Sequence, residues 1–253
     1  MKRLQRKGPA LVSKLLPALL LLALSGTSFA AERALRFSIN DSWAMPMVRI
    51  EDGKAVEGIL VDLHQRLAAK VGRKAEMVVM PRMRVQHALD TGDIDVRCYV
   101  SPNWVNSGHY RYIWSLPFMT QRDVLAGVTP EKLEPEQLLN ERLGTVLGFT
   151  YPRLEPLFAS GQIQREDART QDQVLLKLSA RRNRYAISNE LSLHWFNRHQ
   201  VPGEKLHHLS EVASDPIACI VRDAPDVPTM ALLRAMVQMK QAGEFDEILA
   251  RYR

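Results

Sequence analysis

The stretch GDIDVRCYVSPNWVNSGHYRYIWSLPF, residues 92–118, decides how the rest of the chain is organised. It opens at a Gly-Asp turn and continues as a run of β-forming residues from Ile94 to Val100. A polar and aromatic segment follows, and a second apolar run ends at Phe118. A strand that leads into such a loop is typical of a ligand crevice, which α/β sheets form at the carboxyl ends of their strands. We therefore expect a crevice here, between a lobe that begins before this stretch and a second lobe that follows it.

The chain before this stretch alternates between predicted strands and helices. Residues 34–39 and 75–80 have the composition and alternation of strands. Between them, leucine and valine recur at helical spacing over residues 60–71, and Gly72 ends the helix. Pro81 begins a second helix. This order predicts an α/β lobe with a largely parallel sheet.

The chain after residue 118 shows the same kinds of pattern, and no flexible linker separates the two halves, so we expect strands to join the lobes. Strands are predicted over residues 118–128, 142–146, 185–188 and 217–221, and helices from Pro135, over 171–180 and 191–196, and from Leu232 to Tyr252 with a break at Gly243.

The segment from Gly148 to Pro152 follows a predicted strand and combines a glycine, a hydroxyl and a proline. Proline is favoured at the first helical position, so a helix that begins at Pro152 would offer free backbone N–H groups to an anion. The alternative is ordinary capping of that helix by Thr150.

The first 30 residues have the pattern of a secretory signal peptide. Five basic residues precede an apolar block from Leu15 to Leu24, and small residues occupy the two cleavage positions at Ser28 and Ala30. A membrane anchor, the alternative, needs about 20 apolar residues, and the block has roughly half of that. We therefore expect export to the periplasm with cleavage after Ala30.

Composition excludes some function classes. Five of the 34 basic residues and none of the 28 acidic ones lie in the leader, so the mature chain has 29 basic and 28 acidic residues. This balance gives no basic footprint for nucleic acid. The histidines have no metal-ligand spacing, and no nucleophile or phosphate-loop motif is present. We expect no metal, no cofactor and no catalytic residue.

The two cysteines, Cys98 and Cys219, meet an oxidising compartment after export. An even number of cysteines in such a compartment favours a disulfide, and the alternative is two buried thiols.

Five segments together resemble the bacterial extracellular solute-binding proteins of family 3, the type that binds polar amino acids. They match the family's motifs in order over essentially the whole mature chain. They are GILVDLHQRLAAKVG at residues 58–72, GDIDVRCYV at 92–100, YIWSLPF at 112–118, LLNERLGTVLGFTY at 138–151 and GEFDEILARYR at 243–253.

The resemblance implies a type II periplasmic-binding-protein fold, with two α/β lobes joined by two crossing strands. Lobe 1 comprises residues 31–120 and 216–253, and lobe 2 comprises residues 121–215. A small ligand binds between them. The fold also places Cys98 and Cys219 on neighbouring strands, so their Cα atoms are expected within about 7 Å. The ligand-binding residues that we expect are Trp43, Arg82, Arg84, Tyr99, Ser101, Trp104, Phe149, Thr150, Tyr151 and Asn189.

The chain departs from the family at the two charges that clamp an amino acid. The segment that carries the family's arginine is Val105–His109 here and has none, and the position of the family's aspartate is Asn189. Loss of both charges would cost several kcal/mol with a plain amino acid. Arg82 and Arg84, at the start of a helix on the crevice side, are the candidates to replace the lost cation, and the alternative is that both face solvent.

The function that this resemblance implies is capture of a small polar or aromatic solute, amino-acid-like or an organic acid, by a monomer. The partner would be the permease of an ABC transporter or a signalling receptor. Two alternatives remain. One is an enzyme on the same scaffold that resembles the cyclohexadienyl dehydratases, with Glu190 or His109 as its acid–base group. The other is a binding protein that has lost its ligand and acts through protein contacts.

Overall fold

Among residues 33–105 and 111–252, which the computed structural model describes, nine strands form one continuous mixed sheet. The strand order is β4-β1-β5-β11-β7-β10-β8-β9, and β6 also pairs with β11. The strands are β1 Leu35–Asn40, β4 Ala75–Met80, β5 Val96–Val100, β6 Tyr112–Trp114, β7 Met119–Gly127, β8 Glu141–Val146, β9 Ile163–Ala168, β10 Tyr185–Asn189 and β11 His207–Arg222, while β2 Arg49–Glu51 and β3 Lys54–Glu57 form a separate hairpin. The predicted signal peptide lies outside the described residues.

The parallel pairs lie toward the two ends of the sheet and the antiparallel pairs in its middle. β1 is parallel to β4 and β5, and β8 is parallel to β9 and β10. The long strands β7 and β11 are antiparallel to each other along most of β7, and each is antiparallel to its outer neighbour. The sheet is therefore more mixed than the largely parallel one that the sequence predicts. The reason is that the chain passes twice, in opposite directions, through its middle.

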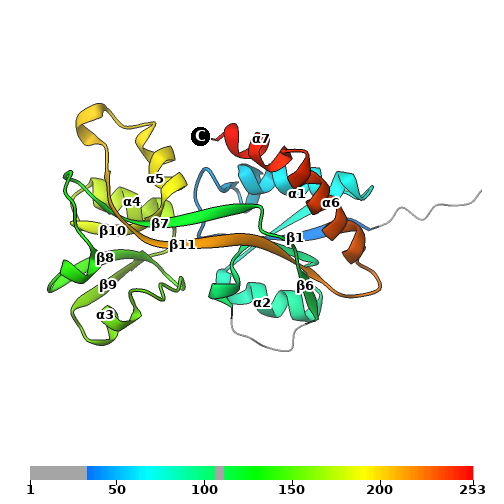
Figure 1. Ribbon diagram of the computed structural model, residues 1–253, viewed down its shortest axis with the longest axis horizontal. Coiled ribbons are helices and arrows are strands. Elements are labelled where there is room, and N and C mark those ends of the chain that lie inside the picture. The colour runs from blue at the N-terminus through cyan, green and yellow to red at the C-terminus, as the bar shows by residue number, and fades with distance from the viewer. Residues whose placement is uncertain (1–32, 106–110, 253) are drawn as a thin grey trace, which may run out of the picture. The chain divides into compact units, whose positions relative to one another are not determined.

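Helices cover both faces of this sheet. Figure 1 shows α1, α6 and α7 on one side of β1 and β11, and α2 on the other side. At the β8 end of the sheet, α4 and α5 lie on one side and α3 on the other (Figure 1). The helices are α1 Ile59–Lys70, α2 Arg82–Thr91, α3 Glu155–Ala159, α4 Gln171–Ser179, α5 Glu190–Asn197, α6 Thr229–Gln241 and α7 Glu244–Ala250, with short 3-10 turns at Pro102–Trp104, Pro135–Gln137 and Pro202–Glu204.

The buried apolar side chains fall into four clusters, because each stretch of the sheet has a core on both faces. The alternation of β7 shows this directly: Val124 and Ala126 belong to the cluster under α4 and α5, whereas Leu125 points into the cluster on the opposite face. The other two clusters are built from residues before Gln121 and after Pro216, with Leu191 at the margin of one of them.

Two predicted helices differ from the observed ones. The segment from Pro135 forms only a 3-10 turn, closed by a capping box between Glu134 and Gln137. The helix expected to begin at Pro152 begins at Glu155 and has five residues. Neither its predicted N-terminus nor Thr150 as its N-cap is present, because residues 152–154 form a turn and Leu154 is the N-cap.

The predicted disulfide between Cys98 and Cys219 is confirmed. The two residues are register partners on β5 and β11, and their Cα atoms lie 4.0 Å apart. The bridge spans 121 residues of sequence, so it removes much conformational freedom from the unfolded chain.

Replacement of both cysteines by alanine is expected to lower the free energy of unfolding by about 2–4 kcal/mol. Urea denaturation of the two proteins without reductant measures the difference. Addition of reductant should bring the original protein to the level of the variant. Equal unfolding midpoints without reductant would contradict this expectation.

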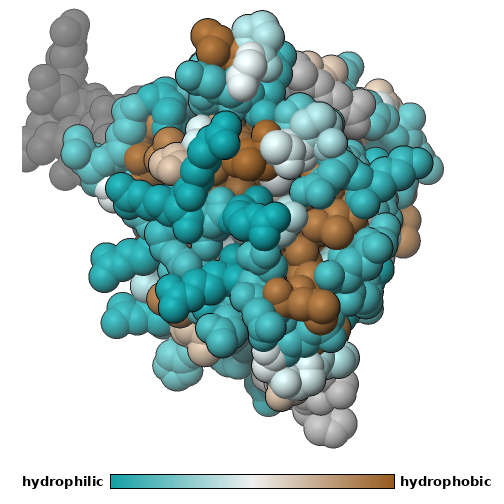
Figure 2. Space-filling model, turned by 90° about the vertical axis from the view of Figure 1, so that its left-hand side faces the viewer, coloured by the Kyte–Doolittle hydropathy of each residue, from teal (hydrophilic) through white to brown (hydrophobic). Residues whose placement is uncertain are grey.

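The surface at the β8 and β9 end is mostly hydrophilic, with hydrophobic residues in small separate groups (Figure 2). Scattered apolar side chains of this kind are normal on protein surfaces. Within the described ranges, no helix is long and apolar enough to cross a bilayer.

Candidate ligand-binding site

A small cavity lies where β7 passes between the two halves of the chain. Its free volume is about 30 Å³, which is room for one or two water molecules. Three groups of residues line it: Trp43, Ala44, Met47, Arg82, Tyr99 and Trp104 from the first part of the chain, Gln121 and Asp123 from β7, and Phe149, Thr150, Tyr151, Gln171, Ile187 and Asn189 from the part between β8 and α5. We call this the inner cavity.

The inner cavity brings together eight of the ten ligand-binding residues that the sequence predicts. The other two lie elsewhere. Arg84 is exposed on α2 and does not line the cavity. Ser101 is fully buried behind it, where its hydroxyl caps the 3-10 turn that holds Trp104 and donates to Asp215 at 3.4 Å.

Aromatic rings form one wall of the inner cavity. The Tyr99 ring makes edge contacts with Trp43 and Trp104, with centroid distances of 5.4 and 6.2 Å. The Trp104 indole N–H donates to Asp215 on β11 at 3.1 Å, which fixes the plane of that ring. Such contacts orient aromatic rings and leave their faces available for a planar or apolar group.

Tyr99 has a backbone φ of 60°, in the left-handed region that tyrosine rarely adopts. Its side chain is 5% exposed, and its hydroxyl has no hydrogen-bond partner among the described residues. Backbone strain of this kind is concentrated at functional sites.

Arg82 reaches the inner cavity from the first turn of α2. Its Nε donates to the Gly148 carbonyl at 2.8 Å, and its guanidinium lies 5.4 Å from the centroid of the Phe149 ring. No carboxylate pairs with it among the described residues. Burial lowers the pKa of Arg82 below its usual value.

Asp123 is a residue of the inner cavity that the sequence analysis missed. It lies on β7, and its carboxylate accepts a hydrogen bond of 2.6 Å from the Gln121 side chain. Burial raises the pKa of Asp123 to about 7, and the nearby Asp215 raises it further, against the opposing effect of the Gln121 bond. The alternation of the strand does not indicate it, because Thr120 and Arg122 on the opposite face are polar as well.

Residues after β8 and β10 complete the inner cavity. The Tyr151 hydroxyl accepts a hydrogen bond of 3.1 Å from the backbone of Val146, which holds the turn that contains Phe149 and Thr150. Asn189 ends β10, and its side chain accepts from the backbone of Ser192 at 2.8 Å. It therefore caps α5 as well as lining the cavity.

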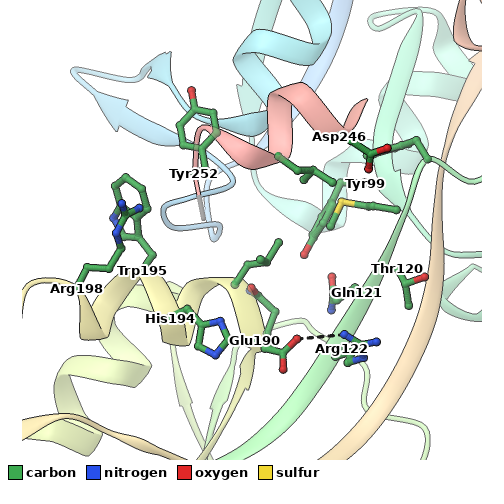
Figure 3. Close-up of a pocket in the computed structure, with 15 residues that line it drawn as sticks. Tyr99, Thr120, Gln121, Arg122, Glu190, His194, Trp195, Arg198, Asp246 and Tyr252 are labelled. Atoms are coloured by element: carbon green, nitrogen blue, oxygen red, sulfur yellow. Dashed lines mark hydrogen bonds and ion pairs between the residues drawn. The ribbon is translucent and has the colours of Figure 1, made fainter. Parts of the chain in front are cut away.

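A larger outer cavity of about 700 Å³ adjoins the inner one and shares Tyr99, Gln121 and Asn189 with it. Its walls are β7, α5 and α7. Figure 3 shows Tyr99 with its hydroxyl directed toward the side where Gln121 lies, and Trp195 and Tyr252 at the opposite side. Tyr99, Gln121 and Asn189 therefore stand between the two cavities.

The acid–base candidates of the enzyme hypothesis do not line the inner cavity. Glu190 lines the outer cavity and pairs with Arg122 at 3.4 Å, as the dashed line in Figure 3 marks. His109 lies outside the described residues. Of the residues that the structure describes, no group of three or more His, Cys, Asp or Glu could hold a metal ion.

Comparison with known proteins gives fold matches only. No protein-family model and no curated protein sequence matches the chain. The solved structures that it resembles include an ancestral arginine-binding protein bound to arginine, with a TM-score of 0.71 and 19% identity over 88% of this chain and 99% of that chain.

Two further matches have similar extents. A histidine kinase sensor domain with similarity to periplasmic binding proteins matches with a TM-score of 0.71 and 16% identity over 88% of this chain and 96% of that chain. The GluR0 ligand-binding core in complex with L-glutamate matches with a TM-score of 0.69 and 15% identity over 87% of this chain and 97% of that chain. The chain therefore has the α/β fold of the periplasmic amino-acid-binding proteins, the fold of solute-binding family 3.

Proposed function

We propose that the protein is a periplasmic solute-binding protein that captures a small polar or aromatic solute between two lobes. Lobe 1 would comprise residues 31–120 and 216–253, and lobe 2 residues 121–215. The four hydrophobic clusters support this division, since two are built almost entirely from the first set of residues and two from the second.

The inner cavity carries the proposal. Residues of both proposed lobes line it, and two of its buried polar atoms, the Tyr99 hydroxyl and the Gln121 carbonyl oxygen, have no hydrogen-bond partner among the described residues. Buried polar groups are almost always paired in folded proteins, so unpaired ones in a cavity support a ligand that pairs them.

Entry of a solute requires movement of the walls. The inner cavity has about 30 Å³ of free volume, which is less than any amino acid occupies. A solute that contacts both lobes favours the closed arrangement, because it makes its full set of contacts only there. β7 and β11 would act as the hinge, since both pass from one set of clusters to the other.

The expected result in a thermal-shift screen of the mature chain is a rise in melting temperature with an amino acid, organic acid or aromatic solute. At 100 times the dissociation constant, the rise should be about 5–10 °C. Trp43→Ala should reduce it strongly. Trp114→Ala, which removes a tryptophan outside both cavities, should not. If a broad panel of periplasmic metabolites gave no shift, the binding function would be contradicted, and the alternative of a protein that acts through protein contacts would be favoured.

The partner in this proposal is a membrane transporter permease or a receptor, with the protein acting as a monomer. The match to a histidine kinase sensor domain supports sensing as a use of the scaffold, alongside transport. Nothing in the charge balance of the mature chain favours nucleic acid as a partner.

An enzyme on the same scaffold is the second candidate, and the raised pKa of Asp123 is the observation that favours it, since a general base works best with a pKa near 7. Incubation of the protein with a cyclohexadienyl acid separates the two candidates. The binding function predicts a thermal shift without product for any solute that binds. Turnover that Asp123→Asn abolishes would establish the enzyme instead.

A further inference from the structure

We propose that the protein holds a small dianionic oxyanion, sulfate or phosphate, between α2 and the sheet, at Arg97, Ser38 and Arg82. This site is separate from the candidate site for the solute, since Arg97 and Ser38 line neither the inner nor the outer cavity. The inference goes beyond the proposed binding function and does not depend on it. It depends on buried polar groups that the protein itself leaves without a partner.

Arg97 is a buried arginine in the middle of β5. It is 8% exposed, and its one hydrogen bond among the described residues goes to the Gln86 side-chain oxygen at 3.4 Å. No aspartate or glutamate in the described part of the chain forms an ion pair with it or contributes to its pKa. Buried arginines are almost always paired with an acid. Most of the N–H groups of Arg97 are therefore available to a further acceptor.

Ser38 on β1 is a second unpaired group on the same face of the sheet. β1 and β5 are parallel, with Phe37 beside Val96, and both of these side chains belong to the core under α1 and α6. Side chains alternate along a strand, so the next residues, Ser38 and Arg97, both point to the opposite face, which α2 covers (Figure 1). Ser38 is 1% exposed, and its hydroxyl has no hydrogen-bond partner among the described residues.

Arg82 adds a second positive charge from the first turn of α2. Burial is the main reason that the pKa of Arg97 falls to about 10, and the nearby Arg82 lowers it further, against an opposing effect of Tyr112. The Nε of Arg82 donates to Gly148, but neither terminal nitrogen has a hydrogen bond among the described residues. Two guanidinium groups with free N–H groups suit an oxyanion, and their two charges match a dianion better than a chloride ion.

The acids closest to Arg97 in the fold are engaged elsewhere. Asp95 lies two residues before it in the chain and pairs with three other arginines. Asp90 is exposed on α2 and accepts a hydrogen bond of 3.0 Å from the Gln86 amide. The chain therefore offers Arg97 an amide oxygen and no negative charge.

An unpaired buried cation should destabilise the protein when no oxyanion is bound. Arg97→Met removes the charge and retains much of the side-chain volume. In a Tris chloride buffer of low ionic strength at pH 8, this variant should melt several degrees above the original protein, because an apolar group replaces an unpaired buried charge. If Arg97 served only to hold α2 through Gln86, the variant would melt at a lower temperature.

Thermal-shift titrations of the mature chain with sodium sulfate and sodium phosphate at pH 8 test the site, with sodium chloride at equal ionic strength as the reference. We expect a saturable rise in melting temperature with the oxyanions, about 5–10 °C at 100 times the dissociation constant. Both oxyanions also stabilise proteins by exclusion from the surface. That effect does not saturate and should be the same in every variant.

Variants assign the saturable rise to the proposed residues. Arg97→Met should abolish it, and Ser38→Ala should weaken oxyanion affinity about 3- to 10-fold. Arg97→Lys, which keeps the charge but not the planar fork, should bind more weakly than the original protein and separates loss of the site from loss of folding. Arg84→Gln, on the exposed side of α2, is the matched control and should leave the rise unchanged.

The outcomes separate this inference from the binding function. No saturable rise with either oxyanion, an equal saturable rise with chloride, or a rise that persists in Arg97→Met would overturn the inference. Trp43→Ala, which alters the inner cavity, should leave the rise unchanged, and its loss there would place the oxyanion in the inner cavity and overturn the inference as well. None of these results bears on the screen with organic solutes, which is run in chloride buffer without oxyanions.

Discussion

Replacement of Asp95 by alanine is expected to lower the free energy of unfolding by about 3–5 kcal/mol. The Asp95 side chain is fully buried just before β5 and pairs with three arginines. Its carboxylate also accepts a hydrogen bond of 3.0 Å from the backbone of Arg36. Removal of the carboxylate leaves three cations close together around a buried cavity. Urea denaturation measures the resulting loss in the free energy of unfolding.

The neighbouring Asp93 provides a matched control. It is exposed in the turn before β5, and its contact is a hydrogen bond from Thr91. Asp93→Ala should therefore cost about 1 kcal/mol or less. If both substitutions lowered the free energy of unfolding equally, the pairing of Asp95 with the three arginines would contribute no more to stability than a surface charge does.

The pairing of Asp95 with these arginines should also make the stability of the protein depend on pH. Burial alone would raise the pKa of Asp95, but the hydrogen bonds from Arg33, Arg36 and Arg222 outweigh it and hold the pKa well below its usual range. For an acid with a lowered folded-state pKa, the stabilisation is present above the unfolded value of about 4 and is lost as the pH falls below it. Asp95→Ala should remove this part of the acid sensitivity.

Replacement of Gly58 by alanine is expected to cost about 3–4 kcal/mol. Gly58 has φ 127° and ψ 170°, a conformation that is almost confined to glycine. A Cβ there would lie 2.5 Å from the Met47 carbonyl oxygen and 2.7 Å from the Val48 Cα. Both neighbours are backbone atoms, so the chain itself would have to shift. Thermal or urea unfolding of the variant measures the cost.

Gly58 also holds part of the inner cavity in place. The backbone N–H groups of Ile59 and Leu60 donate to the carbonyls of Pro46 and Met47 at 2.9 and 3.1 Å. These bonds tie the start of α1 to the loop that carries Trp43, so Gly58→Ala should weaken solute binding as well as stability. Gly53→Ala is the control, because Gly53 has φ 73° but no atom within 4 Å of its added Cβ. A cost near 1 kcal/mol is expected there, and a larger cost than at Gly58 would refute the role of the Met47 contact.

Much of the fold follows from the sequence because local pattern and tertiary structure agree. The strand at Ala75–Met80 has the predicted bounds, and the helix expected between residues 60 and 71 is α1 Ile59–Lys70. The segment from Pro135 failed as a helix because too few apolar residues follow to bury a helical face. The strand that the sequence predicts over Ile217–Val221 is much shorter than the observed strand β11. β11 extends from His207 to Arg222 because pairing with β7 stabilises polar residues that have no strand pattern of their own.

Site residues that lie in family-like segments could be predicted from the sequence. Those that reach the site only through strand pairing could not. Trp43 and Thr150 were expected from their positions in family-like segments, and both line the inner cavity. Asp123 was missed, because a charged residue in a strand usually faces solvent. Only the pairing of β7 with β10 and β11 turns it toward Tyr99 and Tyr151. Arg82 and Arg84 could not be told apart by sequence, since the difference depends on which face of α2 lies over Gly148.

A crystal structure of the protein with the solute that gives the largest thermal shift would test the central claim most directly. We predict that the solute lies in the inner cavity in simultaneous contact with Trp43 and Thr150, which belong to different proposed lobes. A solute that binds in the outer cavity alone, or touches the residues of one proposed lobe only, would contradict the account.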